Sequence, residues 1–175
     1  MAVRKFEQYT PEIAESAFVD DSAVVTGNVV IGADSSVWPM CSVRGDIHSI
    51  RIGERTNIQD GSILHVTHDS EFAPGGNALS IGSDVTVGHN AVVHACTVED
   101  LCLVGMGSVL LDGSIVRSGA IVGAGSLVPP GKDLEGGYLW LGSPVKQVRE
   151  LTENERAFLQ YSARHYVDLK NRHKA

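Results

Sequence analysis

The sequence predicts an all-β solenoid, a parallel β-helix of hexapeptide repeats that ends in a C-terminal α-helix. Two observations support this fold class. Aliphatic residues recur every six positions along most of the chain, which fits neither the period of an α-helix nor the alternation of an ordinary strand. The composition agrees, because 19 glycines and only 6% aromatic residues are typical of many short strands joined by tight turns.

Each hexapeptide is expected to form one short side of a triangular coil. The aliphatic side chain points into the core, and successive coils stack about 4.8 Å apart. The residue two places earlier is usually small, and the residue directly after is often glycine, which we attribute to the backbone freedom that corners require. The aliphatic positions are Val19, Val25, Ile31, Val37, Val43, Ile52, Ile58, Leu64, Ile81, Val87, Val93, Val98, Val104, Leu110, Val116, Val122 and Val128.

Three interruptions separate the runs of repeats. Three residues are added between Val43 and Ile52, one is missing between Val93 and Val98, and eleven are inserted after Leu64. The long insertion is expected to form a loop that leaves the solenoid. Loops that a rigid scaffold presents in this way often carry function.

We expect one domain over residues 1–175, with the β-helix at about residues 12–131 and a helix at about residues 152–170 packed along its side. The repeat is expected to stop at residues 129–131, Pro-Pro-Gly, and an irregular stretch to follow. Thr152 and Glu155 have the spacing of a capping box at the start of the helix. The face expected to pack consists of Phe158, Tyr161, His165 and Leu169.

Charge and hydropathy exclude several function classes. The chain has 14 Lys and Arg against 21 Asp and Glu, which argues against a nucleic-acid partner because such a partner requires a basic surface. No apolar run of about 18 residues predicts a membrane span, and no signal segment is evident, so we expect a cytoplasmic protein. Cys41, Cys96 and Cys102 occupy the small position of the repeat and are expected to be free thiols in the core.

Three histidines occupy special positions in the repeat. His65 and His94 each follow the aliphatic residue of the third side, one coil apart, so their side chains should point outward together and share a metal ion. His89 lies on the second side and could complete the site only from a neighbouring chain, which predicts a homotrimer with metal sites at the subunit interfaces. The same counting places Arg44 and Gln59 on the second side, with Asp46 close to Arg44.

The motifs that carry these residues resemble the γ-class carbonic anhydrases, and more narrowly their bacterial YrdA- and PaaY-like subfamily. The likeness extends over nearly the whole chain and implies that the β-helix is left-handed. It also implies that His65, His89 and His94 bind Zn²⁺, although imidazole ligands also suit Fe²⁺ or Co²⁺. The motifs are Arg44-Gly45-Asp46, residues 57–61 (Asn-Ile-Gln-Asp-Gly), Leu64-His65, and Gly88-His89 through His94.

The resemblance further implies an activity, the reversible hydration of carbon dioxide to bicarbonate by zinc-bound hydroxide. Gln59 would orient the zinc-bound water, and Arg44 and Asp46 would bridge subunits near the site. The chain departs from well-known members at two acidic positions, where it has Ile47 and His68. An imidazole can relay protons near neutral pH, so His68 is a candidate proton shuttle.

Two other functions remain open from the sequence. A metal-binding scaffold with weak or no carbonic anhydrase activity is favoured by the two missing glutamates. A hexapeptide acyltransferase would share the fold, but that class usually relies on a single histidine base, whereas this chain places three histidines together. Metal content would distinguish the acyltransferase from the other two, because fold alone does not determine function.

Overall fold

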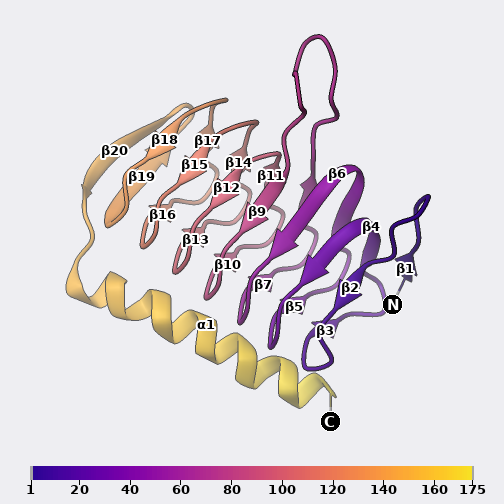
Figure 1. The fold of residues 1–175 in the computed structure, drawn as a ribbon. Helices are drawn as coiled ribbons and strands as arrows, with labels where there is room; N and C mark the ends of the chain where they lie inside the picture. The colour runs from indigo at the N-terminus through magenta and orange to yellow at the C-terminus, as the bar shows by residue number, and fades with distance from the viewer. Residues whose placement is uncertain (1, 175) are drawn as a thin grey trace.

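The computed structural model describes residues 2–174 and shows a left-handed parallel β-helix with one α-helix along its side (Figure 1). The hexapeptide period produces this shape because each aliphatic residue pairs with its counterpart in the next coil. On the second side, for example, Val37 pairs with Ile58, Ile58 with Val87, and Val87 with Val104. These side chains fill the interior, and all four are fully buried.

Three sides define the coil, and nearly all strands pair in parallel. The first side contains β2 (Glu12–Ile13), β9 (Leu79–Ile81), β12 (Thr97–Val98), β15 (Ile115–Val116) and β18 (Asp133–Leu134). The second side contains β3 (Phe18–Val19), β5 (Ser36–Val37), β7 (Asn57–Ile58), β10 (Thr86–Val87), β13 (Leu103–Val104), β16 (Ile121–Val122), β19 (Tyr138–Gly142) and β20 (Val145–Glu150). The third side contains β1 (Ala2–Arg4), β8 (Ile63–His65), β11 (Val92–His94), β14 (Val109–Leu110) and β17 (Leu127–Val128). Two long strands turn from the third side onto the first: β4 (Val24–Ile31) and β6 (Ser42–Ile52).

The small and glycine positions of the repeat are explained by contacts between coils. The hydroxyl of Ser35 in the small position donates to the carbonyl of Gly53 in the next coil at 2.7 Å. A Cβ on Gly53 would lie only 2.6 Å from the backbone of Gly82. Because Gly53 does not have a positive φ, our attribution of this position to backbone freedom was wrong. The glycine is required by close stacking, and the left-handed corner residue lies two positions later, at Arg55.

The β-helix extends beyond the expected end at residue 131. Val116 pairs with Leu134, and Val122 pairs with Trp140, so the six-residue period continues from Val128 through two further positions. Residues 129–131 form an ordinary corner, in which Gly131 has a φ of +66°. The stretch expected to be irregular instead forms β19 and β20, the one antiparallel pair of named strands within residues 2–174.

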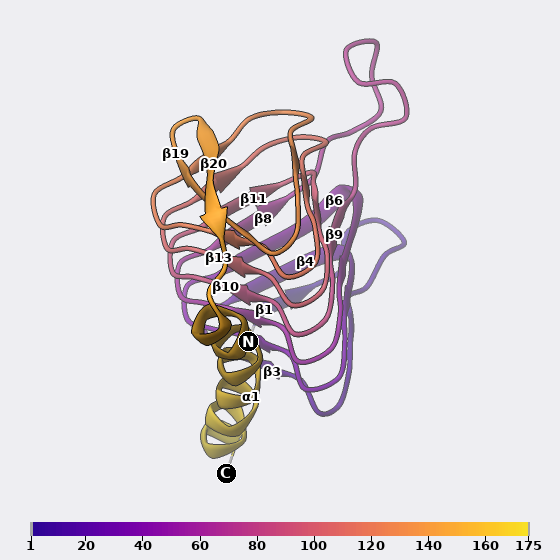
Figure 2. The ribbon, with the colours of Figure 1, turned by 90° about the vertical axis from the view of Figure 1, so that its left-hand side faces the viewer.

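The helix α1 (Glu153–Lys174) begins at the expected capping box. The backbone N–H of Thr152 donates to Glu155 at 2.8 Å, and the N–H of Glu155 donates to the Thr152 hydroxyl at 3.2 Å. The helix runs back along the second side toward the N-terminal coils, as Figures 1 and 2 show. It ends four residues later than expected.

The face of α1 that packs on the β-helix differs from the expected one. Phe158 and Tyr161 are exposed and contact each other, and Tyr161 stacks on His165. The buried residues are Leu159, Ser162, Ala163 and Lys170. Small side chains let the helix approach closely, and the buried polar groups have partners on the coil, such as Thr86, whose hydroxyl lies 2.8 Å from that of Ser162.

The inserted loop and the cysteines agree with the sequence analysis. The loop projects away from the solenoid (Figures 1 and 2), and its stem is closed by a bridge between Thr67 and Asn77. Cys41, Cys96 and Cys102 are free and buried, and burial raises their pKa to about 11, 12 and 12. Within residues 2–174, no helix has the length and apolar character that a bilayer crossing demands.

Candidate metal centre

His65 and His94 lie side by side on the third side of the coil. They are register partners at the ends of the paired strands β8 and β11, as their equivalent positions in the repeat predict. Nδ1 of His65 lies 3.2 Å from Nε2 of His94. The prediction that the two rings meet is therefore confirmed, whereas metal binding by them remains a proposal.

Each of the three predicted metal ligands has a carboxylate partner. Nε2 of His65 lies 3.1 Å from Asp46, and Nδ1 of His94 lies 2.7 Å from Asp112. The third predicted ligand, His89, lies on the corner that follows β10, and its Nδ1 lies 2.9 Å from Asp60. Among the described residues, no other histidine ring forms an ion pair of this kind. Histidine ligands of metals commonly have such a carboxylate behind them, because it holds the ring and its tautomer in place.

Arg44 lies on the third side and not on the second, so its expected position was wrong. Val43 pairs with Leu64, which places Arg44 in the same position of the repeat as His65, one coil earlier. The three residues added after Val43 lie within a bulge at residues 46–49, opposite Asn28, and lengthen one corner without changing the side. As a result, Nη1 of Arg44 donates to Asp46 at 2.6 Å.

His89 belongs to a different edge of the triangle. It follows β10 on the second side, whereas His65 and His94 end strands of the third side. Within residues 2–174 of a single chain, no three His, Cys, Asp or Glu side chains are grouped so that they could hold a metal ion. The structure therefore brings together two of the three predicted ligands.

The electrostatics favour a neutral His65 beside ionised carboxylates. Burial lowers the pKa of His65, and the charge of Arg44 adds to this effect. Burial alone would raise the pKa of Asp46, but hydrogen bonds from Arg44 and His65 outweigh it and hold that pKa below its usual value. The pKa of Asp112 is likewise lowered, because hydrogen bonds from Thr67 and His94 outweigh burial. Neutral imidazole is the form that binds a metal.

Gln59 is held by a chain of buried polar groups on the second side. Its side chain is only 6% exposed, and Nε2 donates to Oδ1 of Asn57 at 3.0 Å. The amide of Asn57 donates in turn to the hydroxyl of Thr86, which contacts Ser162 of α1. This network fixes the amide of Gln59 and leaves its oxygen to accept a further hydrogen bond.

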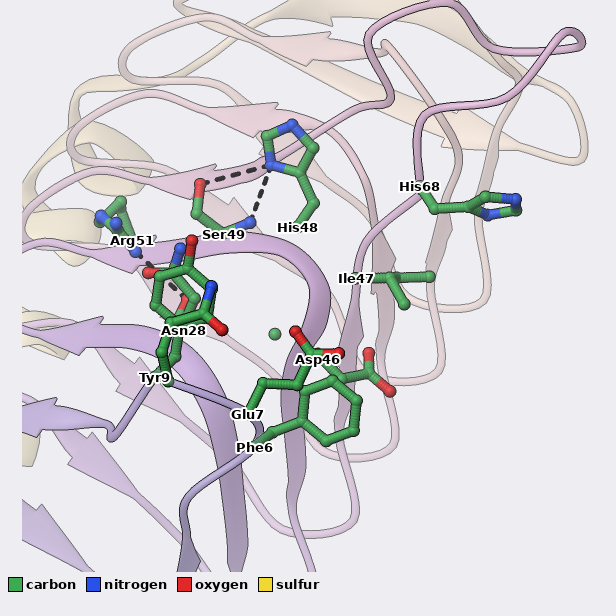
Figure 3. Close-up of a pocket in the computed structure, with 12 residues that line it drawn as sticks. Phe6, Glu7, Tyr9, Asn28, Asp46, Ile47, His48, Ser49, Arg51 and His68 are labelled. Atoms are coloured by element: carbon green, nitrogen blue, oxygen red, sulfur yellow. Dashed lines mark hydrogen bonds between the residues drawn. The ribbon is translucent and has the colours of Figure 1, made fainter.

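An open cavity of about 620 Å³ adjoins the histidine pair at Asp46. Its walls are an N-terminal turn at residues 6–9, the bulge of β6, and His68 from the inserted loop. Figure 3 shows Asp46 facing this space beside Ile47, whereas the ring of His68 points away from Asp46. His68 thus borders the same cavity as Asp46 without a hydrogen bond to it among the described residues.

The donor set of the pair fits a zinc ion. Two nitrogens that each lie about 2.0–2.1 Å from a tetrahedral zinc are separated by about 3.3 Å. The separation of 3.2 Å between the facing nitrogens of His65 and His94 is close to this value. The ring nitrogens that face away are both taken by carboxylates, so the two that face each other are those free to bind a metal.

Sequence reasoning missed the carboxylates behind His89 and His94, and the hydroxyl that contacts one of them. Asp112 accepts from the hydroxyl of Thr67, at the stem of the inserted loop, as well as from His94. One signal was available. Asp112 stands two residues after Leu110, which pairs with Val93, so an acidic corner residue lies one coil beyond His94.

Comparisons with known proteins agree with this architecture. The Escherichia coli protein YrdA is 56% identical over 169 residues, covering 97% of this chain and 92% of YrdA. A carbonic anhydrase of Geobacillus kaustophilus is 45% identical over 95% of this chain and 87% of its own length. A mitochondrial γ-carbonic anhydrase of Arabidopsis thaliana, γ-carbonic anhydrase 1, is 43% identical over 94% of this chain and 60% of its own length.

A solved structure agrees as well. A crystal structure described as a putative acetyltransferase of Bacillus cereus superposes with a TM-score of 0.92 and 37% identity, covering 99% of this chain and 96% of the other. No family model matches the chain. From the full-length identities and the repeat architecture, we conclude that the chain belongs to the γ-carbonic-anhydrase-like family of hexapeptide-repeat proteins.

Proposed function

We propose that the protein is a metal-dependent carbonic anhydrase that hydrates carbon dioxide reversibly to bicarbonate at the interfaces of a homotrimer. The observation that carries this proposal is the pair His65 and His94, in which Nδ1 of one ring faces Nε2 of the other at 3.2 Å with a carboxylate behind each ring. Carbonic anhydrase is also the printed activity of a relative that is 45% identical over most of its length.

His89 of a second copy would complete the ligand set. In the single chain it belongs to another edge of the coil, and its Nδ1 is taken by Asp60, so its Nε2 is the nitrogen it can offer to a neighbour. When bound by three imidazoles, zinc would lower the pKa of a water to about 7 and so supply a nucleophile at neutral pH. Fe²⁺ or Co²⁺ would suit the same ligands.

The remaining side chains would orient groups and move protons. Gln59 would accept a hydrogen bond from the reacting water through the amide oxygen that Asn57 leaves free. Arg44 would keep Asp46 ionised and directed at His65. His68 borders the cavity next to Asp46 and would pass the released proton to solvent.

A metal-bearing scaffold without catalysis is the second candidate. Ile47 and His68 occupy positions at which well-known γ-class carbonic anhydrases have acidic residues. Ile47 presents an exposed apolar side chain to the cavity. The deciding experiment is metal analysis of anaerobically purified protein together with a buffered assay of carbon dioxide hydration. If the protein contains metal and a chelator abolishes its hydration of carbon dioxide, the result supports the proposal that it is an enzyme. Full metal content with no hydration at high buffer concentration supports the scaffold and rejects the enzyme.

A further inference from the structure

Asp112 connects the candidate ligand His94 to the stem of the inserted loop. One oxygen of its carboxylate accepts from Nδ1 of His94 at 2.7 Å, and the other accepts from the hydroxyl of Thr67. Thr67 closes the loop through backbone hydrogen bonds in both directions with Asn77. A single carboxylate therefore contacts both a proposed ligand and the eleven-residue insertion in the repeat.

The contact lies beside the corner at which the repeat lacks one residue. Thr67 belongs to the coil before His94 and Asp112 to the coil after it, so their backbones are two strand spacings apart, about 9.6 Å. The corner between them is shortened by one residue and occupied by Ala95, which hydrogen-bonds to His65 below and Gly113 above. Ala95 is only 1% exposed.

We propose that Asp112 is a positioning residue that holds His94 in its Nδ1–H tautomer and couples this ring to the inserted loop through Thr67. The proposal deepens the proposed metal-binding function and rests on it. It concerns Asp112 and Thr67, which are not among the proposed ligands. Its first consequence, the Nδ1–H tautomer of His94, can be measured without any metal.

The chemistry follows from the two ends of the imidazole. A neutral ring carries one N–H, and an ionised carboxylate can only accept, so Asp112 requires the hydrogen to be on Nδ1 of His94. The lone pair is then on Nε2, which faces His65. Asp46 acts on the opposite nitrogen of His65, Nε2, and leaves Nδ1 free. The two carboxylates thus select different tautomers on neighbouring rings, and each directs a lone pair to the same point.

The first test measures the tautomer directly in metal-free protein. In histidine labelled with ¹⁵N at about pH 8.5, above the ordinary imidazole pKa of about 6.5, long-range proton–nitrogen spectra distinguish Nδ1–H from Nε2–H rings. We expect His94 to be Nδ1–H in the wild type and in Asp112→Asn, whose amide oxygen can still accept. We expect Asp112→Ala to shift the ring toward Nε2–H. An unchanged His94 tautomer in Asp112→Ala would overturn the proposal.

The second test measures Zn²⁺ affinity and loop protection. Asp112→Ala should weaken zinc binding by about 10–100-fold, and Asp112→Asn should lose less. Thr67→Val should weaken zinc binding less than Asp112→Ala, because His94 keeps its carboxylate partner, and should increase amide hydrogen exchange in the loop. The matched control is Asp133→Ala, which removes a carboxylate of β18 that pairs with Arg117 instead of a histidine. Equal zinc affinity in wild type and Asp112→Ala would also overturn the proposal.

The two tests separate the failure of this inference from the failure of the proposed function. If the wild type binds no zinc but its His94 tautomer depends on Asp112, the positioning role stands and the metal function fails. If zinc binds in the wild type and neither the tautomer nor the affinity responds to Asp112, the metal function stands and the positioning role fails. A wild-type spectrum with His94 in the Nε2–H form would also overturn the proposal, so the tests do not depend on the Ala variant folding normally.

Discussion

Nζ of Lys170 lies 2.7 Å from Oδ1 of Asp34, and this pair joins the last turns of α1 to an early coil of the β-helix. Lys170 is 1% exposed and also donates to the carbonyl of Ser16 and to the side chain of Asn171. A buried ammonium group is tolerated here because all three of its hydrogens have acceptors. This lysine therefore anchors the C-terminal part of the helix to the β-helix.

Lys170→Ala should lower the free energy of unfolding by about 2–3 kcal/mol, since three hydrogen bonds and the packing of the stem are lost. The loss stays below that of a fully buried pair, because the side chain of Asp34 is 43% exposed and water can solvate it. Lys170→Met, which keeps the stem, should lose less. Urea denaturation at one fixed protein concentration measures both. Equal stability of Lys170→Ala and wild type would show that this anchor does not hold the helix.

The register of the histidines predicts a specific pattern of complementation. His65→Ala and His89→Ala should each abolish metal binding, but co-refolded mixtures should regain up to about one quarter of the sites, because a site takes its ligands from two chains of a cyclic trimer. The control is a mixture of His65→Ala with His94→Ala. These two ligands come from the same chain, so no complete site can form. Metal analysis of the separated trimers distinguishes the cases, and equal recovery in both mixtures would contradict the two-chain site.

The oligomeric state is a separate prediction. Light scattering should give a mass of about 56 kDa, three times the 18.6 kDa of the chain. His65→Ala should keep this mass if the trimer does not depend on the metal. A monomer that binds zinc through all three histidines would contradict the proposed interface.

His68→Ala should lower the turnover of carbon dioxide hydration, because general acid–base help of this kind is worth about 10²–10⁴-fold. Added imidazole buffer should restore part of the loss, and His68→Glu should sustain activity. Metal content should stay constant in all three proteins. The control is His165→Ala, which removes an exposed ring that stacks on Tyr161 of α1, away from the cavity. Loss of metal in His68→Ala would mean that His68 is a ligand and not a shuttle.

The capping box predicts a pH-dependent contribution to stability. Hydrogen bonds from Arg149 and Thr152 lower the pKa of Glu155 from 4.5 to about 2 in the folded protein. A depressed folded-state pKa means that this stabilisation is fully present above about pH 4.5 and is lost as the pH falls toward about 2. The difference in Tm between wild type and Glu155→Gln should therefore be constant near neutral pH and shrink below about pH 4.5.

Circular dichroism melts across this pH range provide the measurement. Glu153→Gln, which changes a carboxylate of the same turn outside the capping box, serves as the control and should not reproduce the Glu155 profile. A Tm difference for Glu155→Gln that persists unchanged at the acid end of the range would rule out the ionised capping box as its source.

The sequence alone determined the repeat, the pairing of His65 with His94, and the start of the helix. Each of these depends on counting along the chain: a six-residue period fixes the side and the coil of a residue, and a capping box lies within one turn. Counting failed at two corners, the lengthened one after Val43 and the one at residues 129–131. Arg44 was assigned to the wrong side, and the coil that contains Leu134 and Trp140 was missed because Pro-Pro-Gly resembled an end.

Only the tertiary structure decided which side chains meet across the corners and which face of α1 packs. Thr67 and Asp112 are 45 residues apart, yet the hydroxyl of Thr67 donates to the carboxylate of Asp112. The helix buries Ser162 and Lys170 instead of Phe158 and Tyr161. The hydrogen-bond partners of Ser162 and Lys170 lie on the coils against which the helix packs. Such contacts depend on the positions of distant backbones in space, which a local sequence pattern does not contain.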